Sequence, residues 1–449
     1  MTRETGAGAG NERELAFRAL SSFRRKGVFA PELPDPERDG PGRRAAALVT
    51  RITRGVLRNM ALCDFYIESF SSLPARKIEP QVLDILRLSA YQMIFLGKIP
   101  VSAAVNEGVT LARRHANPRA AGFVNAVLRR LADSLDDLPE PRRASRHEML
   151  AIRYSHPKWL VSEFDSALGG AGLEELLAAN NEQPPLTVRV NTLKTDAEAA
   201  ARSLEAQGLR AERRVSPPGS LDLRGGGNPG DMNALRDGHV FVQDASSTLA
   251  ALAASPSPGD KVLDGCAAPG GKSFAAAIEM KNTGAITSRD VSADRLTLVE
   301  SGARRLGVTI IRTCPADARV CADADSAGSM DIVYADVPCS GFGVIRRKPE
   351  IRYKDPEKLR SLRDAQLDIL SCLSTYVKPG GRLIYSTCTV FRRENEDIVE
   401  EFLRRRGGFY AEPFALPGDL AAAPDGMVTL WPHIHGTDGF FICRLRRSS

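Results

Sequence analysis

The sequence predicts a multidomain protein with an all-α N-terminal bundle, a small α+β subdomain and then an α/β domain with a largely parallel sheet. The chain has 449 residues, which leaves room for two or three domains of about 150 residues each. Only helical patterns occur before residue 135, whereas short apolar strands alternate with helices after residue 240. We therefore expect domains at 1–135, 145–240 and 241–449.

The N-terminal segment reads as a helical bundle. Pro80 begins and Gly97 ends an almost continuously apolar run, and proline at the start and glycine at the end are typical helix boundaries. Apolar residues recur at helical spacing over 101–112 and 123–131, and a polar, proline-broken linker follows at 136–143. Basic residues near the helix ends either hold RNA phosphates or form a solvated face: Arg113, Arg114, His115, Arg119, Arg129 and Arg130.

The middle segment mixes helix and strand. Residues 186–191 alternate like a half-buried strand, and a helical stretch over 196–207 ends at Gly208. Turn-rich runs at 217–219 and 225–230 indicate loops. We therefore expect a small α+β subdomain.

Composition excludes several classes of protein. No window approaches the roughly 18 apolar residues of a membrane span, and no apolar segment follows the N-terminus, so a cytoplasmic protein is expected. The 61 basic and 55 acidic residues give a net charge of +6, which is compatible with a polyanionic partner without requiring one. The eight cysteines form no C-x-x-C pair and His433 and His435 lack ligand partners at suitable spacing, so no metal is expected and most cysteines should be reduced.

A candidate cofactor site follows the strand at 261–264, where a glycine-rich turn runs into a helix that begins near Ser273. A strand, a tight turn and a helix N-terminus point backbone N–H groups at a ligand. The turn lacks G-x-G-x-x-G, and Cys266 stands where a phosphate-binding loop has its first glycine. This disfavours nucleotide hydrolysis.

Acidic residues follow successive strands of the same segment. Asp290 ends the strand at 285–289 and lies 19 residues after Gly271, the spacing at which doubly wound folds present an acid to ribose hydroxyls. Asp317 follows the apolar run 308–311, and Asp336 closes the strand at 330–335. Carboxylates at one sheet edge favour a nucleoside ligand.

Two cysteines, Cys339 and Cys388, also fall at this edge, just past the strands at 330–335 and 382–386. A thiolate there could add to an electron-poor ring carbon. Either cysteine alone is more typical of a buried core, but the shared edge and Pro338 favour a reactive pair. The basic run 345–354, which includes Tyr353, is suited to a phosphate track and a stacking surface for unpaired RNA, or to a solvated loop.

Taken in order, three motifs resemble the RsmB (Sun/Fmu) family of S-adenosylmethionine-dependent RNA cytosine-C5 methyltransferases. They are Asp264 to Lys272, Asp336 to Arg347, and Ser386 to Thr389 with Glu394-Asn395-Glu396. The segments 106–109 and 122–130 resemble the NusB-like RNA-binding domain fused to that enzyme. The resemblance covers nearly the whole chain and implies a Rossmann-like methyltransferase domain.

The resemblance also implies roles for single residues. Cys388 would attack C6 of the target cytosine, and Cys339 would assist loss of the C5 proton and release of the enzyme. Asp336 would bind the cytosine N3 or amino edge, which favours a protonated or shared-proton carboxyl. The S-adenosylmethionine pocket would be formed by Cys266, Ala267, Ala268, Pro269, Gly270, Gly271, Lys272, Asp290, Asp317 and Asp336.

The expected substrate is small-subunit (16S) ribosomal RNA, single-stranded or locally melted, and the expected oligomeric state is a monomer. The same chemistry on tRNA or another rRNA site stays open. A non-catalytic RNA-binding or antitermination protein is the more distant alternative, and it would need neither Cys339 nor Cys388. Four residues depart from the family pattern without removing a reacting group: Gly265, Ser292, Val337 and Phe342.

Overall fold

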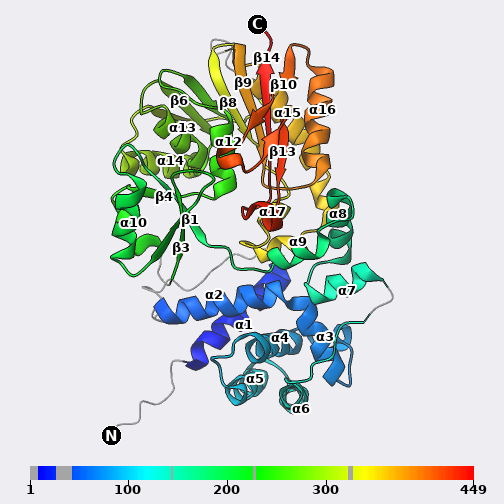
Figure 1. The fold of residues 1–449 in the computed structure, drawn as a ribbon. Coiled ribbons are helices and arrows are strands. Elements are labelled where there is room, and N and C mark those ends of the chain that lie inside the picture. The colour runs from blue at the N-terminus through cyan, green and yellow to red at the C-terminus, as the bar shows by residue number, and fades with distance from the viewer. Residues whose placement is uncertain (1–8, 27–42, 143–144, 226–228, 322–326) are drawn as a thin grey trace. The chain divides into compact units, whose positions relative to one another are not determined.

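The computed structural model describes residues 9–26, 43–142, 145–225, 229–321 and 327–449. The chain forms two compact units (Figure 1). We call residues 1–181 with 348–354 the helical unit, and residues 182–347 with 355–449 the sheet unit. Among the described residues, no helix is long and apolar enough to cross a membrane.

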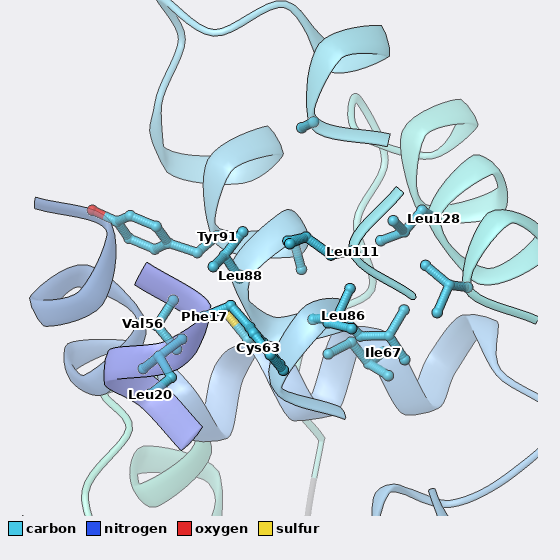
Figure 2. Packing of buried hydrophobic residues seen from close by; sticks show 14 of the residues in the cluster. Phe17, Leu20, Val56, Cys63, Ile67, Leu86, Leu88, Tyr91, Leu111 and Leu128 are labelled. Carbon is cyan, nitrogen blue, oxygen red and sulfur yellow. The ribbon is translucent and has the colours of Figure 1, made fainter. Parts of the chain in front are cut away.

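The helical unit is built around α4, which confirms the central helix expected after Pro80. Pro80 occupies the first turn, and the helix ends where the Leu96 N–H donates to Gln92 O at 3.2 Å. Side chains from the neighbouring helices, such as Ile67 and Leu128, close around it (Figure 2). The helices are α1 (Ala9–Lys26), α2 (Arg43–Arg58), α3 (Met60–Phe70), α4 (Pro80–Phe95), α5 (Val101–His115), α6 (Ala120–Asp133), α7 (Arg146–Arg153), α8 (Lys158–Leu168) and α9 (Leu173–Ala179).

The sheet unit opens with a small antiparallel sheet in the order β2-β3-β1-β4. Asp196 caps the helix on this sheet by accepting from the Ala199 N–H at 2.8 Å, and the buried Val188 and Leu204 belong to the common core. The elements are β1 (Leu186–Val190), α10 (Ala197–Glu205), β2 (Arg210–Arg213), β3 (Ser220–Arg224), α11 (Asn233–Arg236) and β4 (Val240–Val242). The helices α7 to α9, which the sequence analysis grouped with this subdomain, fall in the helical unit, and the boundaries at 135, 145 and 240 stay a prediction.

The large sheet has the order β10-β14-β9-β8-β5-β6-β7, with β13 paired to β14. The five strands from β9 to β7 are parallel, whereas β14 runs antiparallel to β9. The strands are β5 (Lys261–Asp264), β6 (Ala285–Asp290), β7 (Ile311–Pro315), β8 (Met330–Asp336), β9 (Val377–Thr387), β10 (Phe409–Ala411), β13 (Met427–Leu430) and β14 (Phe440–Arg447), and a separate pair is formed by β11 (Phe414–Ala415) and β12 (Ala422–Ala423).

Helices cover both faces of this sheet (Figure 1). One face packs against α12 (Ala245–Ala253), α13 (Gly271–Glu279) and α14 (Ala293–Leu306), and the other against α15 (Leu362–Ser374) and α16 (Glu396–Arg405); α17 (Pro432–His435) precedes β14. Parallel strands end at the same edge, so the segments that follow β5, β6, β7, β8 and β9 are brought together there. The predicted α/β architecture is confirmed.

One expected strand is misplaced. The strand expected at 308–311 is β7, and it begins only at Ile311. Helix α14 ends at the left-handed Gly307, and the Val308 N–H still donates into the last helical turn. Val308 is buried because it packs against that helix end, so its apolar character marks a helix terminus and not a strand.

One pair of cysteines also differs from the reduced state expected for most of them. Cys321 forms a disulfide with Cys372, with the two Cα atoms 5.3 Å apart. Cys321 lies beyond β7 and Cys372 is a buried residue of α15, so their proximity arises from the tertiary fold and leaves no pattern in the sequence. Among the described residues, the other six cysteines form no disulfide.

Candidate active site

The turn between β5 and α13 is shaped by glycine. Gly270 has a φ of 110°, and a Cβ there would lie 2.5 Å from the ring of Phe274. Ser273 at the start of the helix donates to the Asp264 carboxylate at the end of the strand, with an O–O distance of 2.7 Å. Burial raises the pKa of Asp264 to about 6. The strand end and helix start are thus fixed to each other at the sheet edge.

A cavity of about 510 Å³ lies at this edge. Seven of the predicted site residues line it: Cys266, Ala268, Asp290, Asp317, Asp336, Cys339 and Cys388. The other predicted cofactor residues belong to the same turn and helix but are not among the described residues that line the cavity: Ala267, Pro269, Gly270, Gly271 and Lys272. The turn therefore contributes part of the cavity wall, while its remaining residues shape the backbone behind it.

Asp290 is buried at the edge and is held by three groups. Its carboxylate accepts from the backbone N–H of Ala268 at 3.2 Å and of Ser292 at 3.1 Å. Arg295 lies 3.3 Å from the same carboxylate and donates to Ala268 O at 2.7 Å. Arg295 lines the cavity but was not predicted. Its position at the start of the helix that follows Asp290 could have indicated that it lies near this carboxylate.

Asp317 forms a local ion pair with another unpredicted cavity residue, Arg319, at 2.6 Å. Hydrogen bonds from this side chain and its backbone N–H lower the pKa of Asp317 to about 2. Ala365 and Ile369 of α15 line the cavity as well, and no motif distinguishes them from ordinary helix residues. The cavity thus combines an acid–arginine pair with an apolar wall.

Asp336 and Lys272, both expected at the site, form an ion pair, with Lys272 Nζ 2.6 Å from Asp336 Oδ2. Ser386 donates to the other carboxylate oxygen at 2.8 Å. Lys272 also lies 3.2 Å from Ser247 Oγ.

The two cysteines meet as predicted. Cys339 Sγ and Cys388 Sγ lie 3.2 Å apart, and both residues line the cavity. The hydrogen bond with Cys388 and burial raise the pKa of the Cys339 thiol well above its usual value. Gly343 helps to fix the turn that carries Cys388, because its backbone N–H donates to Cys388 O at 3.0 Å. The two sulfurs are therefore within contact distance of each other at the cavity wall.

The arginines of the basic run after Cys339 are engaged within the protein, whereas Lys348 and Lys354 are exposed, so a phosphate track along this run stays a prediction. Arg346 is buried and donates to Asp438 at 2.5 Å. Arg347 bridges two acids, at 2.5 Å to Asp438 and 2.6 Å to Asp244. These guanidinium groups are used within the sheet unit to fix one loop to another.

The end of the same run is buried in the helical unit. Arg352 is fully buried and donates to backbone carbonyls where three helices end: α2 at Arg58 (3.1 Å), α7 at Ser155 (2.9 Å) and α9 at Asn180 (3.5 Å). Helix C-termini leave carbonyls without partners and carry partial negative charge, which a guanidinium satisfies. Tyr353 donates to Leu57 O at 2.8 Å, and its ring packs edge-on against Phe23 in the core of the helical unit.

The basic residues predicted on the N-terminal bundle fall into three groups. Arg114 and His115 both approach Glu14, at 3.3 and 3.5 Å, and Glu14 partly neutralises the charge of Arg114. Arg113 and Arg119 are exposed. The remaining two are engaged locally: Arg129 Nε donates to Asn125 Oδ1 at 3.2 Å, and Arg130 Nη1 donates to Phe70 O at 3.2 Å.

His433 and His435 lie in the short helix α17. His435 Nδ1 accepts from the backbone N–H of Trp431 at 2.8 Å, which is a local structural contact. In the part of the chain that the structure describes, no three His, Cys, Asp or Glu side chains are grouped so that they could hold a metal ion.

The cavity fits S-adenosylmethionine. Its volume lies within the roughly 300–1,000 Å³ of small-molecule sites. Acids at the ends of β6 and β8 and just after β7 face it, a glycine turn borders it, and an apolar helix face offers a surface for an adenine ring. The fold and this site define a Rossmann-like, S-adenosylmethionine-dependent methyltransferase.

Comparisons with known proteins identify the family. Residues 251–446 match the family described as "16S rRNA methyltransferase RsmB/F", residues 10–133 match the NusB family, and residues 156–228 match the ferredoxin-like domain of RsmF/B-like methyltransferases. The chain is 38% identical over 409 residues to the probable ribosomal RNA small subunit methyltransferase B of Bacillus subtilis, covering 89% of this chain and 90% of the relative. The protein of the same name from Synechocystis is 33% identical and is matched over 99% of its length, with 97% of this chain covered.

Solved structures agree. The structure titled "Crystal Structure of PH0851" has a TM-score of 0.80 at 26% identity and covers 99% of this chain and 100% of its own. A methyltransferase homologue from Pyrococcus horikoshii has a TM-score of 0.59 at 25% identity and covers 68% of this chain and all of its own. The chain belongs to the RsmB/F family of 16S rRNA methyltransferases, and its N-terminal helical domain is of the NusB family.

Proposed function

We propose that this protein methylates C5 of a cytosine in small-subunit ribosomal RNA and that it does so through a covalent bond between Cys388 and C6 of that cytosine. The observation that carries the proposal is the cysteine pair, with sulfur atoms 3.2 Å apart at the cavity that Asp336 also lines. Transfer to an oxygen or nitrogen atom requires no sulfur nucleophile, whereas the unreactive C5 of cytosine does. We further propose that the enzyme acts in the cytoplasm as a monomer.

The attack begins at Cys388. Its thiolate forms the S–C6 bond, and the electrons of the C5=C6 double bond move toward C5 and the ring nitrogen N3. The Asp336 carboxylate accepts a hydrogen bond from the cytosine amino group, and Lys272, 2.6 Å from Asp336, stabilises the negative charge that develops on the ring. S-adenosylmethionine supplies the methyl group, which becomes bonded to C5.

Release reverses the addition. The Cys339 thiol passes its proton to the departing Cys388 sulfur while it accepts the C5 proton, the C5–H electrons restore the C5=C6 bond, and the S–C6 bond breaks with its electron pair on Cys388. The 3.2 Å separation of the two sulfurs supports this role of Cys339 in transferring both protons. The proton then passes to water, so each turnover yields 5-methylcytosine, S-adenosylhomocysteine and one proton.

The first experiment is bisulfite sequencing of ribosomal and transfer RNA from cells with and without the gene. We expect one protected cytosine to disappear from small-subunit rRNA alone. A site lost from tRNA would keep the chemistry and change the substrate. A pattern with no lost site would contradict the methyltransferase proposal and favour a protein that only binds RNA.

A second experiment tests the covalent step. Small-subunit rRNA transcribed with 5-fluorocytidine should form a denaturation-resistant adduct with the wild-type protein and S-adenosylmethionine, because fluorine cannot leave C5 as the proton does. Cys388→Ala should form no adduct and no 5-methylcytosine while still binding RNA. Methylation by Cys388→Ala would show that another residue is the nucleophile.

A further inference from the structure

Glu394 lies beside the turn that carries Cys339 and accepts three hydrogen bonds there. It ends a short helical turn (Arg392–Glu394) and is only 3% exposed. Its Oε2 accepts from the backbone N–H of Ser340 at 2.8 Å and from Gln366 Nε2 at 3.1 Å, and its Oε1 accepts from Ser340 Oγ at 2.6 Å. Gln366 also donates to Pro338 O at 3.0 Å. The residues on both sides of Cys339 are therefore anchored, directly or through Gln366, to one carboxylate.

The next residue, Asn395, holds the turn that carries Cys388 in the same way. It is fully buried, its Oδ1 accepts from Thr387 Oγ1 at 2.6 Å, and its Nδ2 donates to Thr389 O at 3.1 Å. These partners are the two neighbours of Cys388. The hydroxyls of Ser340 and Thr389, 3.0 Å apart, join the two turns. Two consecutive residues thus hold one reactive cysteine each.

The two anchors differ in charge. Asn395 is neutral, whereas Glu394 forms no ion pair with any described residue and is bonded only to neutral donors. Burying a carboxylate without a cationic partner is costly, and a neutral amide could anchor a turn at lower cost. The negative charge also acts on Cys339, because Glu394 is among the groups that raise the pKa of that thiol. A charge at this position therefore does more than fix the backbone.

We propose that Glu394 is a positioning residue that keeps Cys339 protonated and 3.2 Å from Cys388, and that Asn395 holds Cys388 for attack. The proposal rests on the covalent chemistry proposed above. During release, the Cys339 S–H bond transfers its proton to the departing Cys388 sulfur while Cys339 accepts the proton from C5. One proton enters and one leaves Cys339, so the thiol is restored, and Cys388 loses its proton to water before the next attack.

The test compares Glu394→Gln, Asn395→Ala and the control Glu400→Gln, which alters an exposed carboxylate of α16 that pairs with Arg392. Each variant is given transcribed small-subunit rRNA and S-adenosylmethionine. We measure methyl incorporation, the protein–RNA adduct on denaturing gels, and the pH dependence of the rate.

Glu394→Gln should lower kcat by at least tenfold, accumulate the adduct several-fold above wild type, and move the alkaline limb of the rate–pH profile to lower pH. Asn395→Ala should lower the rate without accumulating the adduct, because attack is impaired before release. Glu400→Gln should behave like wild type. An adduct that rises in Glu394→Gln but not in Asn395→Ala is a result that general loosening of the fold would not give.

The proposal is overturned if Glu394→Gln turns over like wild type, or if it slows with neither adduct nor a shifted profile. If Glu394→Gln does not fold, Ser340→Ala serves instead, because it removes one of the hydrogen bonds and keeps the charge. Ser340→Ala should then accumulate more adduct than wild type, though less than is expected of Glu394→Gln. A Ser340→Ala variant that accumulates no adduct would count against the proposal. Wild-type protein that forms neither 5-methylcytosine nor an adduct with 5-fluorocytidine RNA would refute the proposed function itself; an active wild type beside an unaffected Glu394→Gln would refute only this inference.

Discussion

The Cys339 turn and the basic segment that follows it lie within twenty residues of each other in the sequence, yet the turn faces the cavity and the arginines of the segment are engaged within the protein. Both were expected to face the substrate. The turn does line the cavity, with Cys339 beside Cys388. The arginines of the basic segment, 345–354, are engaged within the protein, whereas Lys348 and Lys354 are exposed. A motif of reacting groups therefore predicted its location, and a run of like charges did not.

The difference has a physical cause. A thiol in a turn has few alternative uses, whereas a guanidinium carries five donors and satisfies any cluster of acceptors that the fold brings together. Arg352 meets the C-terminal carbonyls of three helices, and Arg346 and Arg347 share the carboxylate of Asp438. These acceptors lie far away in the sequence, so the charge pattern could not reveal them.

The largest effect on stability is expected for Arg352→Ala. It leaves several buried carbonyls without donors, at a cost of about 3–5 kcal/mol. Denaturant unfolding gives the free energy, and hydrogen exchange should show faster exchange at the ends of α2, α7 and α9. If Arg352 instead contacted RNA, the variant would keep wild-type stability and lose RNA affinity. That result would contradict a structural role for Arg352 in the helical unit.

A smaller effect is expected for Asp438→Asn. The substitution keeps the shape but removes the charge that two arginines share, which should lower the free energy of unfolding by about 2–3 kcal/mol. Asp419→Asn, at an exposed turn of the same unit, is the control and should stay within about 0.5 kcal/mol of wild type. Equal stabilities for the two variants would mean that this ion network does not hold the loop.

Much of the fold and part of the site were predictable from the sequence because they depend on local chemistry. Gly270 and the acid at the end of β6 predict a ligand-binding turn. Cys339 and Cys388 follow two parallel strands, and parallel strands end at the same edge of the sheet, so the sequence predicts that the two cysteines lie close together. The Lys272–Asp336 pair was missed because its partners are 64 residues apart in the sequence, one in the first turn of α13 and the other at the end of β8. The same limit applies to Cys321 and Cys372.

The smallest stability effect, and the sharpest test of where RNA is held, is expected for the double variant Arg113→Ala/Arg119→Ala. Both side chains are exposed, so stability should change by less than about 0.5 kcal/mol. If they contact phosphates, affinity for RNA should fall about equally across sequences, and the slope of log affinity against log salt should become shallower by about 1–2. Arg114→Ala is the matched control on the same helix, because Glu14 already neutralises part of its charge. Loss of affinity in the control and not in the double variant would reverse this assignment. Loss of affinity in the double variant alone would show that the exposure of a charge, and not the number of arginines in a run, identifies the RNA-binding surface.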